Sequence, residues 1–450
     1  MTAGDGREHL DRISVVDDVI ALDELPIDGV EPDLAEIDPE FGENLDDGQP
    51  ISRLALNVVA PQSGDAALGL SVELYPDAHD AHCMLQSRLP GPPRSGRTAS
   101  RSWRVSFLDD ILGQPDALRA TAAALAADTP LLDRLRALPG THRSAILTGM
   151  GSSHAALYPA HLALLEMGMP NAWADTGELL HYSASGIGSG SLLVIASQSG
   201  ESVEIVRLIE RLPRDVTIVG VTNHADSTLA RRADVPIVLR AGSEGVVATR
   251  TYVATVAALH LAVTAIGGGS VQVAREEIES AATALATVAA RHEQYGDALG
   301  RALGAPPRDL FLVGRGPSFA SAMAGSLVVK EASLTGCEPL SGGHFRHGPI
   351  EMVSAQTSAL LFSPAGRTHG LMRRLAADIH RYGGRVALVG PADAIGPGAH
   401  LPIVDTGTVP ESVAPLVEIV AAEIYTIACA RGRGREPAVF DRLGKVTREE

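Results

Sequence analysis

The chain has 450 residues, of which 45% are hydrophobic and 20% charged, so it is long enough for two or three domains with their own cores. Its formal net charge of −17 argues against a nucleic acid or an anionic membrane as the main partner. The three cysteines lie far apart and include no CxxC pair, which disfavours a disulfide framework and a thiolate zinc site. A reducing cytoplasm is the expected location, and no cofactor or metal ion is expected.

Residues 1–104 differ in composition from the rest of the chain. Residues 1–50 carry a net charge of −14 and are rich in Asp, Glu and Pro, whereas residues 105–450 carry only −5. This composition predicts an N-terminal extension that is disordered or partly ordered, with a candidate strand pair within residues 54–75. An alternative is that translation of the native protein starts at Val105.

From about residue 144 onward, short apolar runs alternate with helical patterns, which is typical of βαβ units. The pattern occurs twice: the turn Gly149-Met-Gly151-Ser-Ser153 matches Gly314-Arg-Gly316-Pro-Ser318. The next landmarks, Ser197 and Ser363, follow 48 and 49 residues after the first glycine of each turn. Such a repeat predicts two tandem α/β domains, each a flavodoxin-like parallel sheet between layers of helices.

The expected strands are 145–148, 192–196, 216–221, 236–239, 310–313, 358–362, 385–389 and 401–404, and the expected helices include 155–166, 318–334 and a buried helix at 252–266. The expected domains are the extension 1–104, a first domain over 105–280, a second over 281–430 and a C-terminal tail over 431–450.

Three loops at expected strand ends of the first half combine small residues with hydroxyls. Glycines let a backbone approach a ligand closely, and the free N–H groups at the start of a helix attract anions. These loops therefore predict a phosphate site without a lysine; the alternative is that the serines are ordinary helix N-caps. The loops are Gly151-Ser152-Ser153, Ser197-Gln198-Ser199-Gly200-Glu201-Ser202 and Gly245-Val-Val-Ala-Thr249.

The Ser-Gln-Ser-Gly-Glu-Ser loop together with the upstream Gly-Ser-Ser turn resembles the sugar isomerase (SIS) domain family. The double arrangement over residues 105–450 is similar to the isomerase half of glucosamine-6-phosphate synthase. This resemblance implies a pocket for a phosphorylated sugar or aminosugar, in a homodimer with its active site at the subunit interface. The residues that it implies for the pocket are Gly151, Ser152, Ser153, Ser197, Gln198, Ser199, Ser202, Val247 and Thr249.

The second half carries the candidate catalytic groups. Glu331 ends a predicted helix, and His347 lies 16 residues later in a Gly/Pro loop. A carboxylate and an imidazole suit proton transfer next to a carbonyl, although such a Glu is ordinarily a solvated charge and such a His structural. The resemblance implies that Glu331 moves a proton between C1 and C2, that His347 of a neighbouring subunit assists ring opening, and that Lys445, after Gly444, closes over the sugar. Glu338 matches an acidic substrate-contacting position of the family.

Several positions depart from the family pattern. Val328 and Ala324 stand where the family carries Lys and Glu, and His344 replaces an acid. Nothing in residues 1–104 resembles a glutaminase domain, so glutamine-dependent amination by this chain alone is not expected. We therefore expect an aminosugar-phosphate deaminase/isomerase. The alternatives are a fructosamine-6-phosphate deglycase and a non-catalytic sugar-phosphate-binding regulator.

Overall fold

The computed structural model describes residues 54–59, 69–74, 106–392, 401–442 and 444–447. The chain separates into two compact units, residues 1–102 and residues 103–450. In the first unit, β1 (Leu54–Val59) and β2 (Gly69–Leu74) pair antiparallel, as expected for this stretch, with Leu54 opposite Leu74. The disorder expected for the remainder of the N-terminal extension lies outside the described residues.

The first sheet of the second unit has five parallel strands in the order β4-β3-β5-β6-β7. The central strand β5 is buried along its whole length, which explains its uninterrupted apolar sequence LLVIA. The strands are β3 (Ala145–Gly149), β4 (Asn171–Asp175), β5 (Leu192–Ala196), β6 (Thr217–Thr222) and β7 (Val235–Val238).

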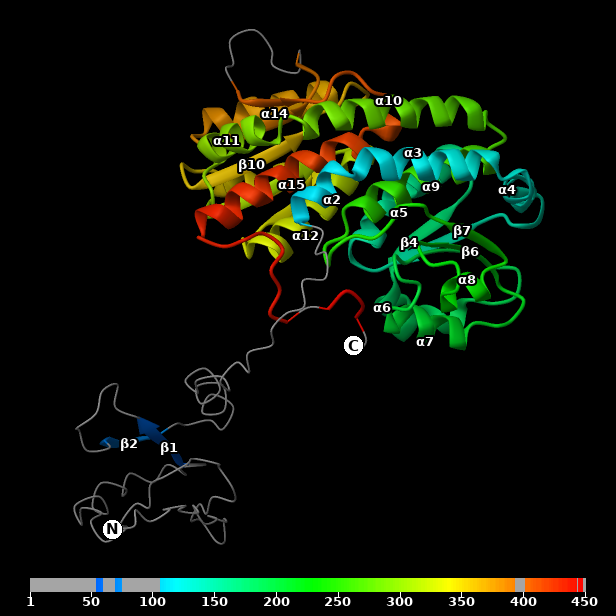
Figure 1. Cartoon of the computed structure of the whole chain (residues 1–450), viewed down its shortest axis with the longest axis horizontal. Coiled ribbons are helices and arrows are strands. Elements are labelled where there is room, and N and C mark those ends of the chain that lie inside the picture. The colour runs from blue at the N-terminus through cyan, green and yellow to red at the C-terminus, as the bar shows by residue number, and fades with distance from the viewer. Residues whose placement is uncertain (1–53, 60–68, 75–105, 393–400, 443, 448–450) are drawn as a thin grey trace, which may run out of the picture. The chain divides into compact units, whose positions relative to one another are not determined.

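The second sheet repeats the first, with the parallel order β9-β8-β10-β11-β12. Each strand of the first sheet thus has a counterpart at the same place in the second, so the predicted pair of flavodoxin-like sheets is confirmed (Figure 1). The strands are β8 (Asp309–Gly314), β9 (Glu338–Ser341), β10 (Thr357–Phe362), β11 (Arg385–Gly390) and β12 (Ile403–Asp405).

The sequence prediction missed two of the four edge strands, β4 and β9. Their sequences, NAWAD and EPLS, contain no apolar run, and all nine of these residues are only partly buried or exposed. A prediction that relies on buried apolar residues does not detect such strands, whereas the other two edge strands, β7 and β12, contain buried apolar residues and were predicted.

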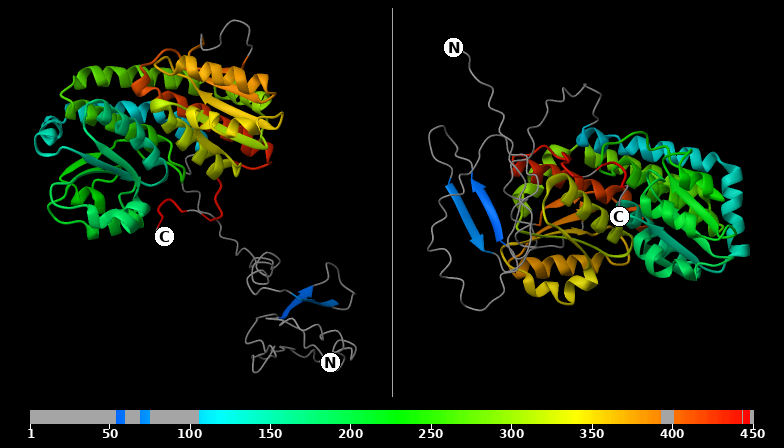
Figure 2. Two further views of the ribbon diagram at one scale, coloured as in Figure 1. Left: turned by 180° about the vertical axis from the view of Figure 1, so that it is seen from behind. Right: turned by 90° about the horizontal axis from the view of Figure 1, so that it is seen from below.

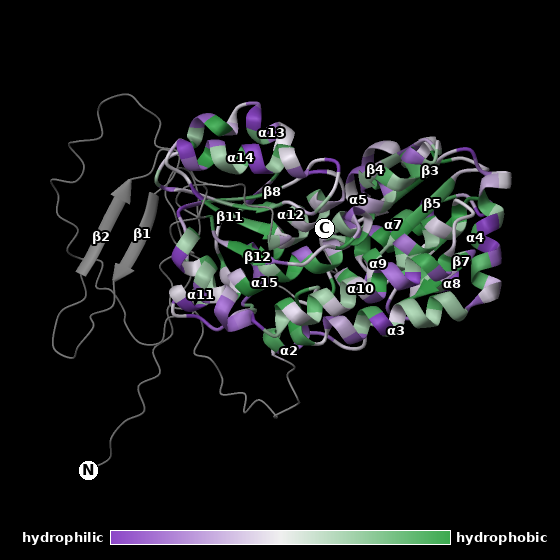
Figure 3. Cartoon of the chain, turned by 90° about the horizontal axis from the view of Figure 1, so that it is seen from above, coloured by the Kyte–Doolittle hydropathy of each residue, from purple (hydrophilic) through white to green (hydrophobic). Residues whose placement is uncertain are grey.

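Helices cover both sheets and fill the space between them (Figures 2 and 3). In Figure 3, α5, α9, α12 and α15 lie between the sheets, whose central strands are coloured hydrophobic. The helices of eight or more residues are α3 (Gln114–Ala127), α4 (Thr129–Thr141), α5 (Gly151–Glu166), α7 (Val203–Arg211), α9 (Arg250–Ile266), α10 (Val271–Ala289), α11 (His292–Leu303), α12 (Phe319–Ser333), α14 (His369–Arg381) and α15 (Pro415–Gly432).

Shorter helical segments are α2 (Phe107–Leu112), α6 (Thr176–Glu178), α8 (Thr228–Arg232), α13 (Gly342–Arg346), one π turn (Leu179–Ser183) and 3-10 turns at Ala184–Gly186, Gly316–Ser318, Pro349–Met352 and Glu411–Val413. None of the helices in the described part of the chain combines the length and hydropathy needed to cross a bilayer.

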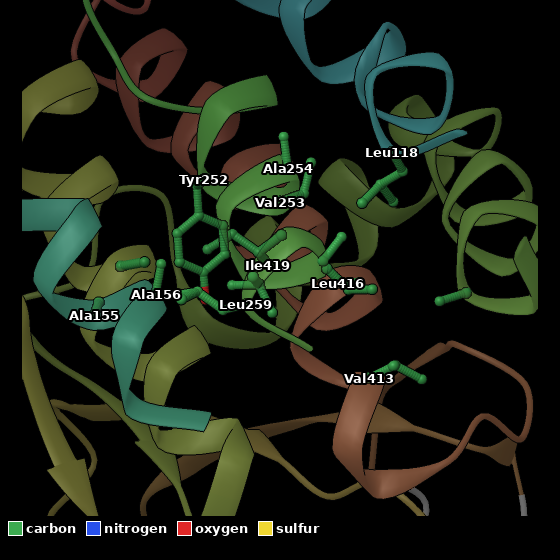
Figure 4. Close-up of a cluster of buried hydrophobic side chains, with 14 of the residues drawn as sticks. Leu118, Ala155, Ala156, Tyr252, Val253, Ala254, Leu259, Val413, Leu416 and Ile419 are labelled. Carbon is green, nitrogen blue, oxygen red and sulfur yellow. The ribbon is translucent and has the colours of Figure 1, made fainter. Parts of the chain in front are cut away.

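The two domains share one core. As expected, α9 is buried on nearly all sides, with Tyr252 and Leu259 among its buried side chains. Figure 4 shows Tyr252 among residues of α5, α9 and α15, including Ala156 and Ile419. Residue 280, the predicted boundary between the two domains, lies within helix α10, which packs against both α3 and α15.

Helix α15 brings two carboxyl groups into this core. Glu418 accepts hydrogen bonds from Ser318 and Ser321 at 2.9 and 3.0 Å, and Glu423 accepts one from Gln114 at 2.6 Å. Burial raises the pKa of each glutamate to about 8, and the hydrogen bonds only partly oppose it. Both groups are therefore mainly protonated in the folded protein at neutral pH.

These shifts predict a stability that falls with rising pH. The pKa of Glu423 is about 4.5 when unfolded and about 8 when folded, so its contribution is complete below pH 4.5 and is lost as the pH rises through 8. Glu423→Gln removes this titration. We therefore expect the effect of the substitution on the free energy of unfolding, measured against wild type, to be more favourable at pH 8 than at pH 5 by about 1–3 kcal/mol. Urea denaturation at both pH values measures this change. Glu279→Gln, at an exposed side chain, is the control, and equal pH dependence of Glu423→Gln and wild type would contradict the assignment.

Candidate functional site

The first predicted loop joins β3 to α5. Gly151 begins α5 with φ +52°, in the left-handed region that favours glycine, and this turn exposes the start of the helix. No side chain caps α5, so Ser152 and Ser153 do not act as N-caps here. The hydroxyls of this turn are therefore not committed to closing their own helix.

The second loop joins β5 to α7. The Ser197 oxygen accepts a hydrogen bond from the Gly200 N–H at 3.1 Å, and the Ser199 oxygen accepts one from the Glu201 N–H at 3.1 Å. Ser202 occupies the N-cap position of α7 but makes no side-chain cap bond. The Ser197 and Ser202 hydroxyl oxygens lie 3.5 Å apart and can share one hydrogen bond, while the Ser199 hydroxyl retains an O–H to donate. The loop therefore presents a set of neutral donors at the start of a helix.

The third loop precedes α9 and is organised by a carboxylate. The Glu244 side chain is 1% exposed and accepts hydrogen bonds from the Thr249 and Thr251 N–H groups at 3.1 and 2.9 Å. Thr249 and Val247 are buried, and the Thr249 hydroxyl has no hydrogen-bond partner among the described residues. Glu244 thus caps α9 in place of Thr249.

The C-terminal tail, red in Figure 1, crosses the second and third loops. Lys445 Nζ donates to Glu244 Oε1 at 2.9 Å and also to the Gly245 carbonyl. Two residues on, the Thr447 carbonyl accepts a hydrogen bond from the Val203 N–H at the start of α7. The structure therefore brings Lys445 to the loops of the first domain.

Glu331 reaches the same place from the second domain. It lies in the last turn of α12, and burial raises the pKa of its carboxyl to about 6, although the nearby Lys445 charge lowers it. Val328, one turn earlier, and Ala324 are each 1% exposed, so these departures from the family pattern place apolar groups in the core. The Glu331 carboxylate is therefore partly desolvated and is influenced by the positive charge of Lys445.

The other predicted residues are exposed. His347 ends α13 and is exposed, as is His344, and Glu338 is exposed at the start of β9. Among residues 106–392, 401–442 and 444–447, no hydrogen bond or ion pair joins His347 to Glu331 or Lys445. Gly444 is exposed beside Lys445. Within one copy of the chain, Lys445 thus bonds to Glu244 beside the third loop and lowers the pKa of Glu331, whereas His347 is not bonded to either Glu331 or Lys445 among the described residues.

Sequence reasoning missed two acidic residues of this cluster. Glu244 directly precedes the third predicted loop, where one charge beside small residues is a local signal. Asp110 in α2 accepts a hydrogen bond from the Gly245 N–H at 2.7 Å and pairs with Arg250, yet it is 135 residues away in sequence. Burial raises the pKa of Asp110. Only the fold reveals its place.

The acidic groups around Lys445 do not form a metal site. Across the described ranges, no group of three or more His, Cys, Asp or Glu side chains is arranged to hold a metal ion. The arrangement instead suits an anionic ligand on the hydroxyl loops and proton transfer by a carboxylate with a pKa near neutrality.

Comparisons with known proteins bear on the family and the fold. Residues 141–265 match the model of the SIS domain. The glutamine–fructose-6-phosphate aminotransferase of Pyrococcus horikoshii is 27% identical to this chain over 337 residues, which are 74% of this chain and 55% of that protein. The enzyme of the same name from Aliivibrio fischeri is 31% identical over 209 residues, which are 44% of this chain and 33% of that protein. The chain spans about half the length of the curated relatives that it matches.

Solved structures share the two-domain fold. The C-terminal domain of glucosamine-fructose-6-phosphate aminotransferase from Francisella tularensis superposes with a TM-score of 0.68 at 20% identity, over 75% of this chain and 99% of that one. A glucosamine-6-phosphate deaminase from Thermotoga maritima gives a TM-score of 0.57 at 19% identity, over 76% and 99%. Residues 141–265 therefore match a SIS domain, and the chain shares the fold of the C-terminal domain of the Francisella tularensis aminotransferase.

Proposed function

We propose that this chain is a sugar-phosphate isomerase-type enzyme that deaminates and isomerises a phosphorylated aminosugar. The observation that carries the proposal is the meeting of Glu331, with a pKa of about 6, and Lys445 beside the hydroxyl loops of the first domain. A base with a pKa near the working pH is efficient in proton transfer. The names of the aminotransferase and deaminase relatives support the choice of an aminosugar phosphate.

In this proposal the two domains divide the work. The loops after β3 and β5 hold the phosphate through hydroxyls and helix N–H groups. His347 of a second copy opens the sugar ring, which makes the enzyme a homodimer. Glu331 then takes the proton from C2 and returns it to C1, while Lys445 stabilises the enediol or enolamine. Water adds at C2 of the resulting imine and ammonia leaves, so the products are a ketose phosphate and ammonia. Glutamine takes no part.

A fructosamine-6-phosphate deglycase is the second candidate. It is favoured by His344, which replaces the acid that the synthase-like family carries and is exposed beside Arg346 on α13. NMR in deuterated water with glucosamine 6-phosphate, fructose 6-phosphate and a fructosamine 6-phosphate separates the candidates. Ammonia release supports the deaminase, and amine release supports the deglycase. Saturable binding without C1/C2 exchange would instead identify a sugar-phosphate-binding regulator.

Replacing the proposed base should stop proton exchange without abolishing binding. We expect Glu331→Gln to slow C1/C2 exchange by about 10²–10⁴-fold, the range typical for loss of a general base. The affinity for the sugar phosphate should change little, because the phosphate loops are intact. Glu351→Gln, at an exposed residue of the second domain, is the matched control. Full exchange by Glu331→Gln would show that another group is the base.

The pH dependence of exchange should report the titration of Glu331. Since the carboxylate is the active form, kcat/KM should rise with pH on an acidic limb with an apparent pKa of about 6. Lys445→Gln removes the cation that lowers this pKa, so the limb should move to higher pH. Rate measurements between pH 4.5 and 8.5 test both statements. An acidic limb that stays in place in Lys445→Gln would refute the coupling.

Glu244 should act as a positioning residue for Lys445. Glu244→Gln keeps an oxygen for the helix N–H groups but loses the ion pair, so we expect kcat to fall about tenfold or more while KM changes little. Glu244→Asp should lie between Glu244→Gln and wild type. A matching loss of phosphate affinity would mean that Glu244 only maintains the loop.

A further inference from the structure

A second cavity lies at the edge of the second sheet. Its volume is about 720 Å³, within the usual range of small-molecule pockets. One wall is formed by α5 and α9 of the first domain and the other by loops that follow β8 and β10. The residues that matter below are Glu166, Gly316, Arg367, Thr368 and Glu411.

This cavity corresponds by the internal repeat to the candidate active site. Glu331 lies 17 residues after Gly314, and Glu166 lies 17 residues after Gly149. Both glutamates stand in the last turn of the helix that follows the glycine turn, α12 and α5 respectively. Glu166 is thus the repeat counterpart of Glu331.

The backbone that surrounds an anion in the first domain is retained in the second. Gly151 and Gly316 have nearly the same left-handed φ, +52° and +55°. The strand-end serines are held alike: the Ser197 N–H donates to Val221 O at 3.0 Å, and the Ser363 N–H donates to Val389 O at 2.8 Å. Three residues after each serine stands a glycine, Gly200 or Gly366, followed by the start of a helix. We call the second set, residues 363–368 with Gly316, the second cradle.

A carboxylate of the chain itself fills the second cradle. Glu411 Oε2 accepts a hydrogen bond from the Arg367 N–H at 3.1 Å, although it belongs to a segment 44 residues away. The carboxyl group lies so close to Gly366 that a Cβ there would be 2.4 Å from its carbon. At the other side of the cavity the Arg367 side chain pairs with Glu166. The groups that would bind an anion thus already hold one.

We propose that this cavity is a second sugar-phosphate pocket held closed by Glu411, whose carboxylate takes the place of the phosphate. Removing that carboxylate frees the Arg367 N–H and opens the cradle to a phosphomonoester, whose sugar fits the cavity. The wild-type chain therefore binds one sugar phosphate per copy although it contains two similar folds. The ligand class rests on the proposed function, whereas the counterpart relation rests on the repeat.

Isothermal titration calorimetry with fructose 6-phosphate tests this inference. We expect one equivalent bound per wild-type chain and two per Glu411→Ala chain. Glu411→Gln is the matched control: its amide still fills the cradle and accepts from Arg367, so one equivalent is expected. Glu166→Gln breaks the ion pair but leaves Glu411 in place, so it too should bind one.

The outcomes separate this inference from the proposed function. If wild type binds one equivalent of fructose 6-phosphate and a folded Glu411→Ala chain also binds only one, the second pocket is overturned. If wild type binds none and Glu411→Ala binds one, the proposed first site is overturned instead. If Glu411→Ala does not fold, Glu411→Ser replaces it. In a Ser197→Ala/Ser199→Ala background, inorganic phosphate should raise the Tm only when Glu411 is also replaced, and an unchanged Tm there would equally contradict the proposal.

Discussion

The antiparallel packing of α5 on α12 is the constraint on which the arrangement of the molecule depends. The N-terminus of α5 meets the later part of α12, where a Cβ on Gly151 would touch Leu327 at 3.4 Å. Further along, Tyr158 packs edge-on against Phe319 at the start of α12. Each helix therefore starts at the loops of its own sheet and ends near those of the other. This packing takes Glu331 to the first domain and Glu166 to the second.

The shared core holds the two domains together, but it also contains buried acids that lower the stability of the fold. Glu418 and Glu423 are buried at the junction of the domains, where hydrocarbon side chains would pack without a desolvation penalty. Their partners Ser318 and Gln114 come from the second domain and the leading helices, so each hydrogen bond fixes one element on α15. The acids therefore specify how the helices register around the proposed site, at the expense of stability at high pH.

The sequence predicted those parts of the fold that depend on local pattern. Central strands such as β5 and the buried helix α9 were found because continuous burial requires continuous apolar sequence. The edge strands β4 and β9 were missed because none of their residues is buried, so they carry no apolar run. In the site, the loops and Lys445 were indicated by motifs, and the structure places them side by side, whereas Asp110 could not be found because its partner is distant in sequence. Ser202 stands at the N-cap position of α7, but its side chain makes no cap bond, which speaks against the alternative that the loop serines are ordinary side-chain caps.

The crossing of α5 and α12 also bears on how a duplicated gene can diverge. After such a duplication neither half is self-sufficient, since a fragment ending before residue 300 would keep the first set of hydroxyl loops but lose Glu331 and Lys445. The two halves must therefore stay in one chain, because they share the proposed site as well as the hydrophobic core. Substitutions in one half are consequently selected through their effect on the other, which allows one pocket to close while its twin is maintained.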